Sequence, residues 1–289
     1  MWEEKLVIDP PYDFVRVLER LSIDPLKAVN IAEGTVKVPL YDKKKQPFAV
    51  TVHSIGTKLY PQFIIKGEKE KQKEIAIHEV KRIFQWDINL NDVRAHFSKS
   101  NLAQIFLEHE GTPLVLDFHL YHCLIKCIIH QQLNLAFAHK LTERFVHQFG
   151  QKMDGVWFDP TPEEVASLTY SDLRELQFSG RKAEYLIDIS KLIAEGSLDL
   201  EALKHMTDEE IFKKLLPIRG IGPWTVQNIL LFGLGRPNLF PKADIGIQNA
   251  MKKHFGLEKK PSPDEMDELS KEWSPYLSYA SLYLWRSIE

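Results

Sequence analysis

The chain is poor in the features that mark secreted, membrane-spanning and iron–sulfur proteins. Its 289 residues contain only two cysteines, Cys123 and Cys127, which are too few for an iron–sulfur cluster. Their spacing in an apolar, helical-looking segment places both thiols on one side of a helix, where a disulfide would be strained. We therefore expect both cysteines to be reduced, buried and inert, which suits a cytosolic protein.

Membrane and secretion signals are also absent. No apolar run approaches the roughly 18 residues that a membrane span needs, and the first residues lack the basic start and apolar core of a signal peptide. The net charge is only −3, so the overall charge predicts neither a nucleic-acid nor a membrane partner. Neither a G-x-x-x-x-G-K-[ST] phosphate loop nor a G-x-G-x-x-G dinucleotide motif occurs.

Two kinds of hydrophobic period divide the chain. Residues 34–67 alternate apolar and polar positions with turn-like breaks at 42–47 and 56–61, which predicts strands and hairpins. From residue 111 onward the period becomes helical and remains so, for seven or more helices. We predict an α+β fold: a small N-terminal antiparallel β-sheet domain with helices at 1–105, followed by an all-α body at 106–289.

Capping residues set the expected helix boundaries in the body. The N-cap candidates are Thr161, Ser171 and Thr207, of which the first and last have Glu three positions later. The glycines expected at helix ends are Gly150, Gly180, Gly196 and Gly220.

The segment LPIRGIGPWT, residues 216–225, lies between two predicted helices and forms a helix-hairpin-helix at about 208–232. Gly220 and Gly222 allow unusual backbone conformations and leave no side chain over the amides that start the next helix, which suits a phosphate. A plain glycine-rich connection is the alternative. Nine Lys or Arg against two Asp or Glu within 211–260 favour the phosphate interpretation.

Asp244 ends a loop and opens the following helix. Alone, this position predicts an N-cap. A carboxylate held by helix amides is also well aimed, and beside a phosphate-binding hairpin it could stabilise an oxocarbenium-like sugar and orient a water. Both roles can hold together.

These motifs resemble the helix-hairpin-helix DNA glycosylase superfamily, and within it DNA-3-methyladenine glycosylase II, the alkylation-repair type. The resemblance runs nearly end to end. It includes PPYDF, EVKRIFQWDINL, IIHQQLNLAFAHKLTERFVHQFG, SGRKAEYL, the hairpin, Asp244 placed 22 residues after Gly222, and WSPYLSYASLYLW.

The resemblance implies a base-excision-repair enzyme that bends damaged duplex DNA, flips the alkylated nucleotide and hydrolyses its N-glycosidic bond. Asp244 would be the catalytic carboxylate. The amides of Gly220, Gly222 and Thr225 would bind DNA phosphates. Bifunctional relatives have a nucleophilic Lys where this chain has Trp224, so the resemblance favours a monofunctional hydrolase.

The resemblance also assigns the rest of the site. Trp224 and Trp285 match aromatic residues of the base pocket, where an electron-rich ring face suits a cationic alkylated purine; without the resemblance, each would be a core residue. Gln132 matches the residue that wedges into the base stack, with Leu133 as the fallback. Arg181 and Lys182 either contact the DNA backbone or start a solvated helix.

No cofactor is expected to be required. The family often holds Na⁺ or K⁺ at the hairpin through main-chain oxygens, here those of Leu216, Ile218 and Ile221. The same three side chains are expected to lock the hairpin to the core. The expected partner is double-stranded DNA with damaged bases, and the protein is expected to be a cytoplasmic monomer, nucleoid-associated if bacterial.

Several positions depart from the pattern of the family. Asn228, Ile245 and Arg20 replace pocket aromatics, Asn134 replaces a small hydroxyl residue, and Arg219 replaces a proline. The lesion range is therefore open, and two alternatives remain: a glycosylase for deaminated or oxidised bases, and a damaged-DNA-binding protein without catalysis. His119, His122 and His130 lie on one helical stripe, but we expect satisfied or exposed histidines there, not a metal site.

Overall fold

The computed structural model describes residues 1–288. An antiparallel sheet of five strands has the order β1-β5-β4-β3-β2. The strands are β1 (Trp2–Val7), β2 (Ala28–Asn30), β3 (Thr35–Tyr41), β4 (Pro47–Ser54) and β5 (Gln62–Gly67). Buried and less buried residues alternate along β4, as the sequence pattern predicts.

Helices α1 (Phe14–Ser22), α2 (Lys73–Phe84), α3 (Leu90–Phe97) and α4 (Ala103–Glu108) complete the front part, with η1 (Glu70–Gln72) before α2. The predicted turns at 42–47 and 56–61 both lie between strands of the sheet. β1 was not predicted, because only Trp2 of this edge strand is buried and its other residues are charged or partly exposed.

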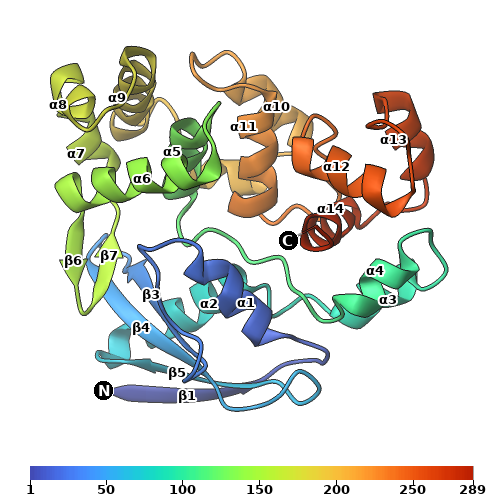
Figure 1. Cartoon of the computed structure of the whole chain (residues 1–289). Coiled ribbons are helices and arrows are strands. Elements are labelled where there is room, and N and C mark those ends of the chain that lie inside the picture. Colours follow the sequence, from blue (N-terminus) through green and yellow to red (C-terminus); the bar gives the residue numbers. More distant parts are fainter. Residues whose placement is uncertain (289) are drawn as a thin grey trace.

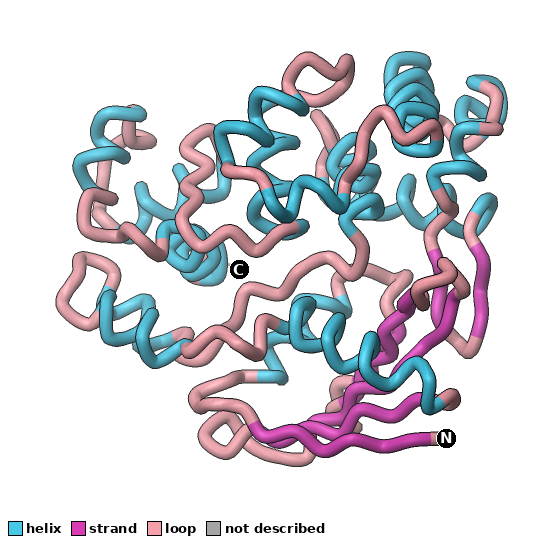
Figure 2. The backbone as a smooth tube through the Cα atoms, turned by 180° about the vertical axis from the view of Figure 1, so that it is seen from behind, coloured by secondary structure: helices cyan, strands magenta, loops and turns pink. Residues whose placement is uncertain are grey.

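The body lies on the other side of α1 and α2 from the sheet (Figure 1). Its helices are α5 (Leu120–His130), α6 (Leu135–Phe149), α7 (Pro162–Ala166), α8 (Tyr170–Glu175), α9 (Gly180–Ala194), η2 (Glu201–His205), α10 (Asp208–Leu215), α11 (Pro223–Asn228), the π-helical turn η3 (Ile229–Gly233), α12 (Ile245–His254), α13 (Pro263–Leu269) and α14 (Leu277–Arg286). The predicted α+β class is confirmed, and Figure 2 shows from behind that the sheet strands are confined to one side.

Three local predictions in the body are wrong. A two-stranded hairpin, β6 (Gln151–Met153) and β7 (Val156–Phe158), interrupts the expected all-α body, and its turn is the Asp154–Gly155 pair, both with positive φ. Thr169, not Ser171, caps α8, because Asp172 lies three positions after Thr169 and completes a capping box. Gly180 begins α9 and does not end a helix, because the Ser179 hydroxyl caps it.

Other local predictions are confirmed. Thr161 and Thr207 form capping boxes, and Pro223 is the first residue of α11. Gly150 caps the end of α6, and Gly196 follows α9 with a positive φ. Cys123 and Cys127 are free and buried. Among residues 1–288, no helix is both long and apolar enough to cross a bilayer.

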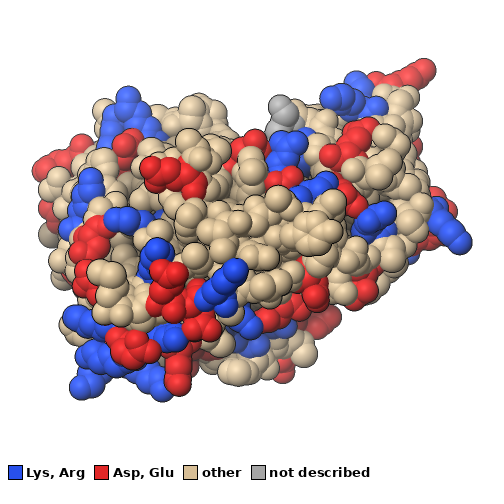
Figure 3. Space-filling model, turned by 90° about the horizontal axis from the view of Figure 1, so that it is seen from below, with Lys and Arg blue, Asp and Glu red and all other residues tan. Residues whose placement is uncertain are grey.

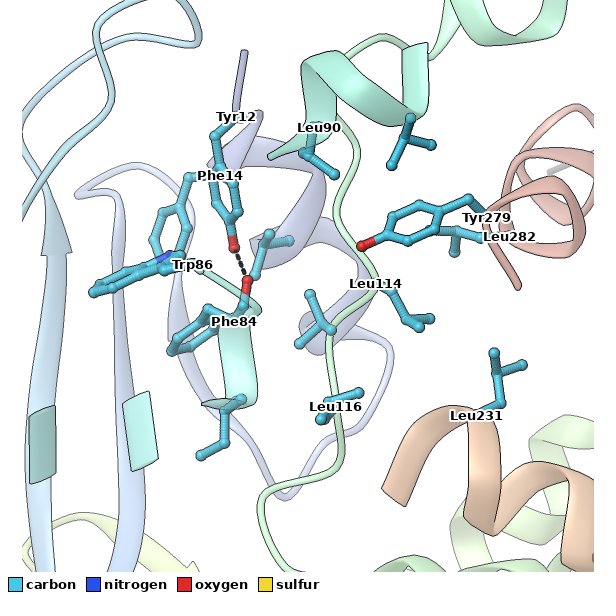
Figure 4. Close-up of a cluster of buried hydrophobic side chains, with 14 of the residues drawn as sticks. Tyr12, Phe14, Phe84, Trp86, Leu90, Leu114, Leu116, Leu231, Tyr279 and Leu282 are labelled. Atoms are coloured by element: carbon cyan, nitrogen blue, oxygen red, sulfur yellow. Dashed lines mark hydrogen bonds between the residues drawn. The ribbon is translucent and has the colours of Figure 1, made fainter. Parts of the chain in front are cut away.

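Two hydrophobic cores position the site. One joins the sheet and α1–α4 to η3, α12 and α14. The other is formed by the helices from α5 through α11. Figure 4 shows part of the first core, where Leu231 of η3 and Tyr279 of α14 point toward the same space as Leu114 and Leu116. The Tyr12 hydroxyl donates to the Phe84 carbonyl there, 2.7 Å away. The C-terminal helices therefore pack with the front part of the chain.

Charges of both signs are interspersed over the surface seen from below (Figure 3). Several cations of the basic segment at 211–260 also have partners. Arg219 pairs with Glu184, Arg236 with Asp208 and Lys242 with Asp267. The local excess of positive charge is therefore smaller in the folded chain than in the sequence.

Candidate active site

The hairpin joins α10 to α11 through residues 216–222. Gly220 adopts φ +97°, and a Cβ there would lie 2.5 Å from Cγ of Tyr185, so only glycine fits. Gly222 precedes α11 in an extended conformation, and a Cβ there would meet no heavy atom within 4 Å. No side chain caps α11. The start of α11 is therefore an open main-chain surface suited to an anion.

Gln131 braces this hairpin from the end of α5. Its Nε2 donates to the Gly220 carbonyl at 2.9 Å and to Oγ1 of the buried Thr225 at 3.0 Å. On the other side, Arg219, which departs from the family pattern, pairs with Glu184 at 2.6 Å. The hairpin is thus fixed to both α5 and α9.

Main-chain oxygens at the predicted cation site still have lone pairs that are not used in hydrogen bonds. The Ile218 carbonyl accepts from the Ile221 amide at 3.0 Å, which leaves its second lone pair for a ligand. Ile221 is buried in the core and Ile218 packs against it, as expected of side chains that lock the hairpin. Leu216 is exposed, so that part of the expectation is wrong: it is the C-cap residue of α10 and lies outside the buried core.

The turn between α5 and α6 separates the two wedge candidates. Gln132 is exposed at φ +57°, a left-handed conformation that few non-glycine residues adopt and that often marks functional sites. Leu133 is partly buried and packs against the helical core. Asn134 caps α6 by accepting from the Phe137 amide at 2.9 Å, the same task that a hydroxyl residue performs there. Of the two wedge candidates, Gln132 is the exposed one.

Arg181 and Lys182 diverge at the start of α9. Arg181 is exposed. The Lys182 ammonium donates to the carbonyls of Ile129 and Gln131, the second at 2.8 Å. Burial lowers the pKa of Lys182 to about 8. Lys182 therefore supports the end of α5 from within the protein, while Arg181 is available to solvent.

Asp244 caps α12, as predicted from its position. Its Oδ1 accepts from the Ile247 amide and from the indole Nε1 of Trp285, both at 2.9 Å. Gly246 leaves room for this pair, because a Cβ there would lie 3.0 Å from both Asp244 Oδ1 and Trp285 Cδ1. Asp244 is half-buried. Two donors on one oxygen fix the plane of the carboxylate and thereby aim Oδ2.

A cavity of about 310 Å³, here called the α11 pocket, is lined by Phe232, whose ring contacts Trp285 of this pair. Trp224, Asn228 and Phe232 form one wall from α11 and η3, and Arg20 faces them from α1. The Trp285 ring stacks on Phe232 with centroids 5.9 Å apart. Contacts therefore run without a break from Asp244 through Trp285 and Phe232 to the cavity.

The predicted aromatic residues occupy different places. Trp224 lines the α11 pocket, whereas Trp285 lies behind Phe232 and touches Asp244. Phe232 was not predicted, although it follows Trp224 by eight residues and Asn228 by four, a spacing that shares a helical face. Ile245 is 64% exposed and does not line the pocket.

The floor of the α11 pocket is polar, which sequence reasoning also missed. Asp117 and Lys126 form an ion pair there. The pKa of Asp117 lies well below its usual range because Lys126 and His122 outweigh the effect of burial, which acts in the opposite direction. His130 also lines the floor, and burial lowers its pKa to about 3, so it is neutral at pH 7.

A second cavity of about 320 Å³, here called the α7 pocket, lies between the sheet side and α7. His122 contacts Asp159 across 2.7 Å through Nδ1. The Nε2 atoms of His119 and His122 are buried without a hydrogen-bond partner, so the expectation of satisfied or exposed histidines fails at these two atoms, although His122 is paired through Nδ1. His130 does have a partner, Oγ1 of Thr142 at 3.1 Å. Among residues 1–288, no group of three or more candidate ligands could hold a metal ion.

Comparison with known proteins assigns the family. The model of the HhH-GPD superfamily base excision DNA repair protein matches residues 125–275, which include the hairpin, Trp224 and Asp244. The chain belongs to this superfamily. The predicted DNA-repair glycosylase, a hydrolase of base excision repair, is thereby confirmed at the level of the family.

Individual relatives agree with this assignment. The chain is 60% identical over its whole length, and that of the relative, to a Bacillus subtilis (strain 168) protein named "Putative DNA-3-methyladenine glycosylase YfjP". It is 34% identical over 227 residues to the DNA-3-methyladenine glycosylase of the same organism, covering 76% of this chain and 74% of the relative. A solved 3-methyladenine DNA glycosylase from Archaeoglobus fulgidus shares the fold, with a TM-score of 0.86 at 22% identity over 99% of this chain and 98% of that one.

Proposed function

We propose that the chain is a monofunctional DNA glycosylase that flips alkylated bases of the 3-methyladenine and 7-methylguanine type out of duplex DNA and hydrolyses their N-glycosidic bonds. The observation that supports this most strongly is the contact path from Asp244 through Trp285 and Phe232 to the α11 pocket. A base in that pocket would leave its sugar near the carboxylate.

The chemistry follows from the position of that carboxylate. As the C1′–N bond breaks, its electron pair leaves with the base and positive charge develops on the sugar. A fixed carboxylate stabilises this charge without having to reorganise. Water then adds to C1′ and loses a proton, which leaves an abasic site. Asp244 can orient that water through Oδ2, since both of its described hydrogen bonds fall on Oδ1.

DNA binding would use surfaces on both sides of the pocket. The open start of α11, with Gly220, Gly222 and Thr225, would bind phosphates of the damaged strand. Gln132 would fill the space left by the flipped base, because it is the exposed one of the two wedge candidates and has a left-handed backbone conformation. Arg181 would contact the backbone. Na⁺ or K⁺ at the carbonyls of Leu216, Ile218 and Ile221 would reinforce the hairpin.

Trp224 indicates which of two reactions, hydrolysis or strand cleavage, the enzyme would perform. It occupies the α11 pocket, and an indole cannot form a Schiff base with the sugar. Water is therefore the nucleophile, and the product retains an intact backbone.

A panel of duplexes, each with one defined lesion, tests the proposal. We expect abasic sites at alkylated purines, strand breaks only after alkali, and no covalent adduct on addition of borohydride. Activity confined to oxidised or deaminated bases would contradict the proposed specificity for alkylated bases and favour a glycosylase of another lesion class. An adduct trapped by borohydride would defeat the monofunctional mechanism, and DNA binding without any excision would favour the non-catalytic alternative.

A further inference from the structure

One polar side chain on the wall of the α11 pocket has an unused hydrogen-bond acceptor. Asn228 lines this wall one turn after Trp224, and its Nδ2 donates to the Trp224 carbonyl at 2.8 Å. Because a carbonyl oxygen can only accept, this hydrogen bond fixes the amide with Nδ2 toward the helix. Among residues 1–288, Oδ1 of Asn228 accepts no hydrogen bond. The half-buried side chain can therefore offer Oδ1 to a ligand in the pocket.

A second acceptor belongs to the floor of the same cavity. The Asp117 amide donates to the Phe232 carbonyl at 2.8 Å, which ties the floor to the wall that contains Asn228. In the carboxylate of Asp117, Oδ1 pairs with Lys126, whereas Oδ2 is buried without a hydrogen-bond partner. Buried acceptors without donors are costly, so the pocket is suited to a ligand that brings N–H groups.

The place of Asn228 in the wall separates stacking from hydrogen bonding. Trp224 precedes it by four residues and Phe232 follows it by four, and all three line the cavity. Rings provide an apolar surface for a flat base, and a few polar groups among them fix its orientation. The family pattern has an aromatic residue at position 228, which has no carbonyl oxygen. In this chain, an acceptor replaces that ring.

Resting on the function proposed above, we propose that Asn228 determines specificity among alkylated purines by accepting, through Oδ1, a hydrogen bond from an exocyclic amino group of the flipped base. 3-Methyladenine and 7-methylguanine both have such a group. Their positive charge makes the amino group a stronger donor, because hydrogen bonds with a charged partner exceed neutral ones. A purine without the amino group leaves Oδ1 unpaired in a partly enclosed cavity, so the site disfavours it.

Two lesions isolate this variable. 7-Methylguanine and 7-methylhypoxanthine have the same methyl group and the same positively charged ring, and only the first has an amino group, at C2. Each is placed at the same position of one duplex sequence. Single-turnover excision rates are measured at mildly acidic pH, where N1 of both bases is protonated, and give the ratio of 7-methylguanine to 7-methylhypoxanthine. When variants are compared, the chemical lability of each base and common effects on DNA affinity cancel in this ratio.

Three substitutions of Asn228 and one control complete the test. Asn228→Leu removes both polar ends of the amide at similar volume, and Asn228→Ala removes them with the rest of the side chain; we expect the ratio to fall about 5- to 10-fold in both. Asn228→Asp retains an acceptor, so its ratio should stay within about twofold of the wild-type ratio or exceed it. Gln227→Leu is the matched control, because Gln227 has the same amide one residue earlier on α11 and does not line the pocket. Its ratio should change by less than about twofold.

An unchanged or higher ratio in Asn228→Leu and Asn228→Ala would overturn the proposal, as would an equal fall in Gln227→Leu. A fall in Asn228→Asp as large as that in Asn228→Leu would also overturn it, because the loss of an acceptor would then not be the cause. Two variants without the oxygen keep the test open if one of them fails to fold. Failure of the proposed function would look different: the wild-type protein would then excise neither base, and Asp244→Asn would change nothing.

Discussion

The two cavities have nearly the same volume, about 310 Å³ for the α11 pocket and 320 Å³ for the α7 pocket. Each also contains a buried carboxylate beside a basic group: Asp117 with Lys126 in the first, Asp159 with His122 in the second. The α11 pocket, however, is joined to Asp244 by contacts through Phe232 and Trp285. Size and buried charge alone would not have distinguished them.

The two pockets differ in where they lie in the fold, and this position distinguishes the candidate active site. The α11 pocket lies where the first core meets the helical core. Residues of α1 and α11 line it, and Trp285 of α14 stacks on Phe232 of its wall. The α7 pocket is closed by α7 and by the start of α5, and none of Trp224, Asn228 and Phe232 lines it. Its His122–Asp159 contact fits a structural role that ties β7 to α5.

The largest expected effect compares two aspartates. Asp244→Asn should lower single-turnover excision by about 10³-fold, because the amide cannot stabilise positive charge on the sugar, while affinity for abasic-site DNA stays within about threefold. Asp159→Asn should leave the excision rate unchanged at temperatures where the variant is folded. An equal loss of excision in both variants would contradict the assignment of the active site to Asp244 and the α11 pocket.

A smaller effect is expected from the indole that bonds Asp244. Trp285→Phe keeps a ring against Phe232 but removes the N–H donor to Oδ1, so excision should fall about 10-fold with DNA affinity unchanged. Trp157→Phe on β7, far from Asp244 in the chain and outside both pockets, is the control and should excise normally. A wild-type rate in Trp285→Phe would show that the indole does not position the carboxylate.

Substitutions of two neighbouring glutamines should have different effects, one on stability and the other on excision. Gln131→Ala removes two hydrogen bonds to the hairpin and should lower the free energy of unfolding by about 1–2 kcal/mol. Gln132→Ala should leave stability within about 0.5 kcal/mol, because the side chain is exposed, yet reduce excision several-fold. Urea unfolding and single-turnover assays measure the two quantities. A loss of stability in Gln132→Ala and a loss of excision alone in Gln131→Ala would contradict these assignments.

A further effect, on stability and not on excision, concerns pH and the α7 pocket. Burial lowers the pKa of His119 to about 4, below that of an unfolded histidine, near 6.5. The unfolded chain therefore binds a proton that the folded chain rejects, and stability should fall by up to about 3 kcal/mol as the pH drops from 6.5 to 4. His119→Gln should flatten this part of the pH profile in urea unfolding; an unaltered slope would contradict the assignment.

Much of the fold could be predicted because local chemistry decided it. Thr161 and Thr207 cap helices through their own side chains and a Glu three residues later, so sequence spacing alone was sufficient. Ser171 failed for the same reason, since Thr169 had a better-placed acid in Asp172. The β6–β7 hairpin was missed although Asp154–Gly155 is a recognised turn pair.

The site was predictable only as far as its residues lie close in sequence or match a family motif. Asp244 was assigned from its helix position and its spacing from the hairpin. Phe232 and the Asp117–Lys126 pair could not be assigned, because their roles depend on which helices face one another across the pocket. Lys182 illustrates the limit: its charge predicted a surface contact, whereas tertiary packing directs it onto carbonyls of the chain itself.

Binding of two abasic-site analogues measures whether Asp244 stabilises positive charge on the sugar. One duplex contains a pyrrolidine in place of the sugar, which carries a positive charge like that of the transition state, and the other contains a neutral tetrahydrofuran. The wild-type protein should bind the pyrrolidine duplex about 10-fold more tightly or better. In Asp244→Asn the two dissociation constants should agree within about twofold. A preference that survives this substitution undiminished would contradict the role of Asp244 in stabilising the charged sugar.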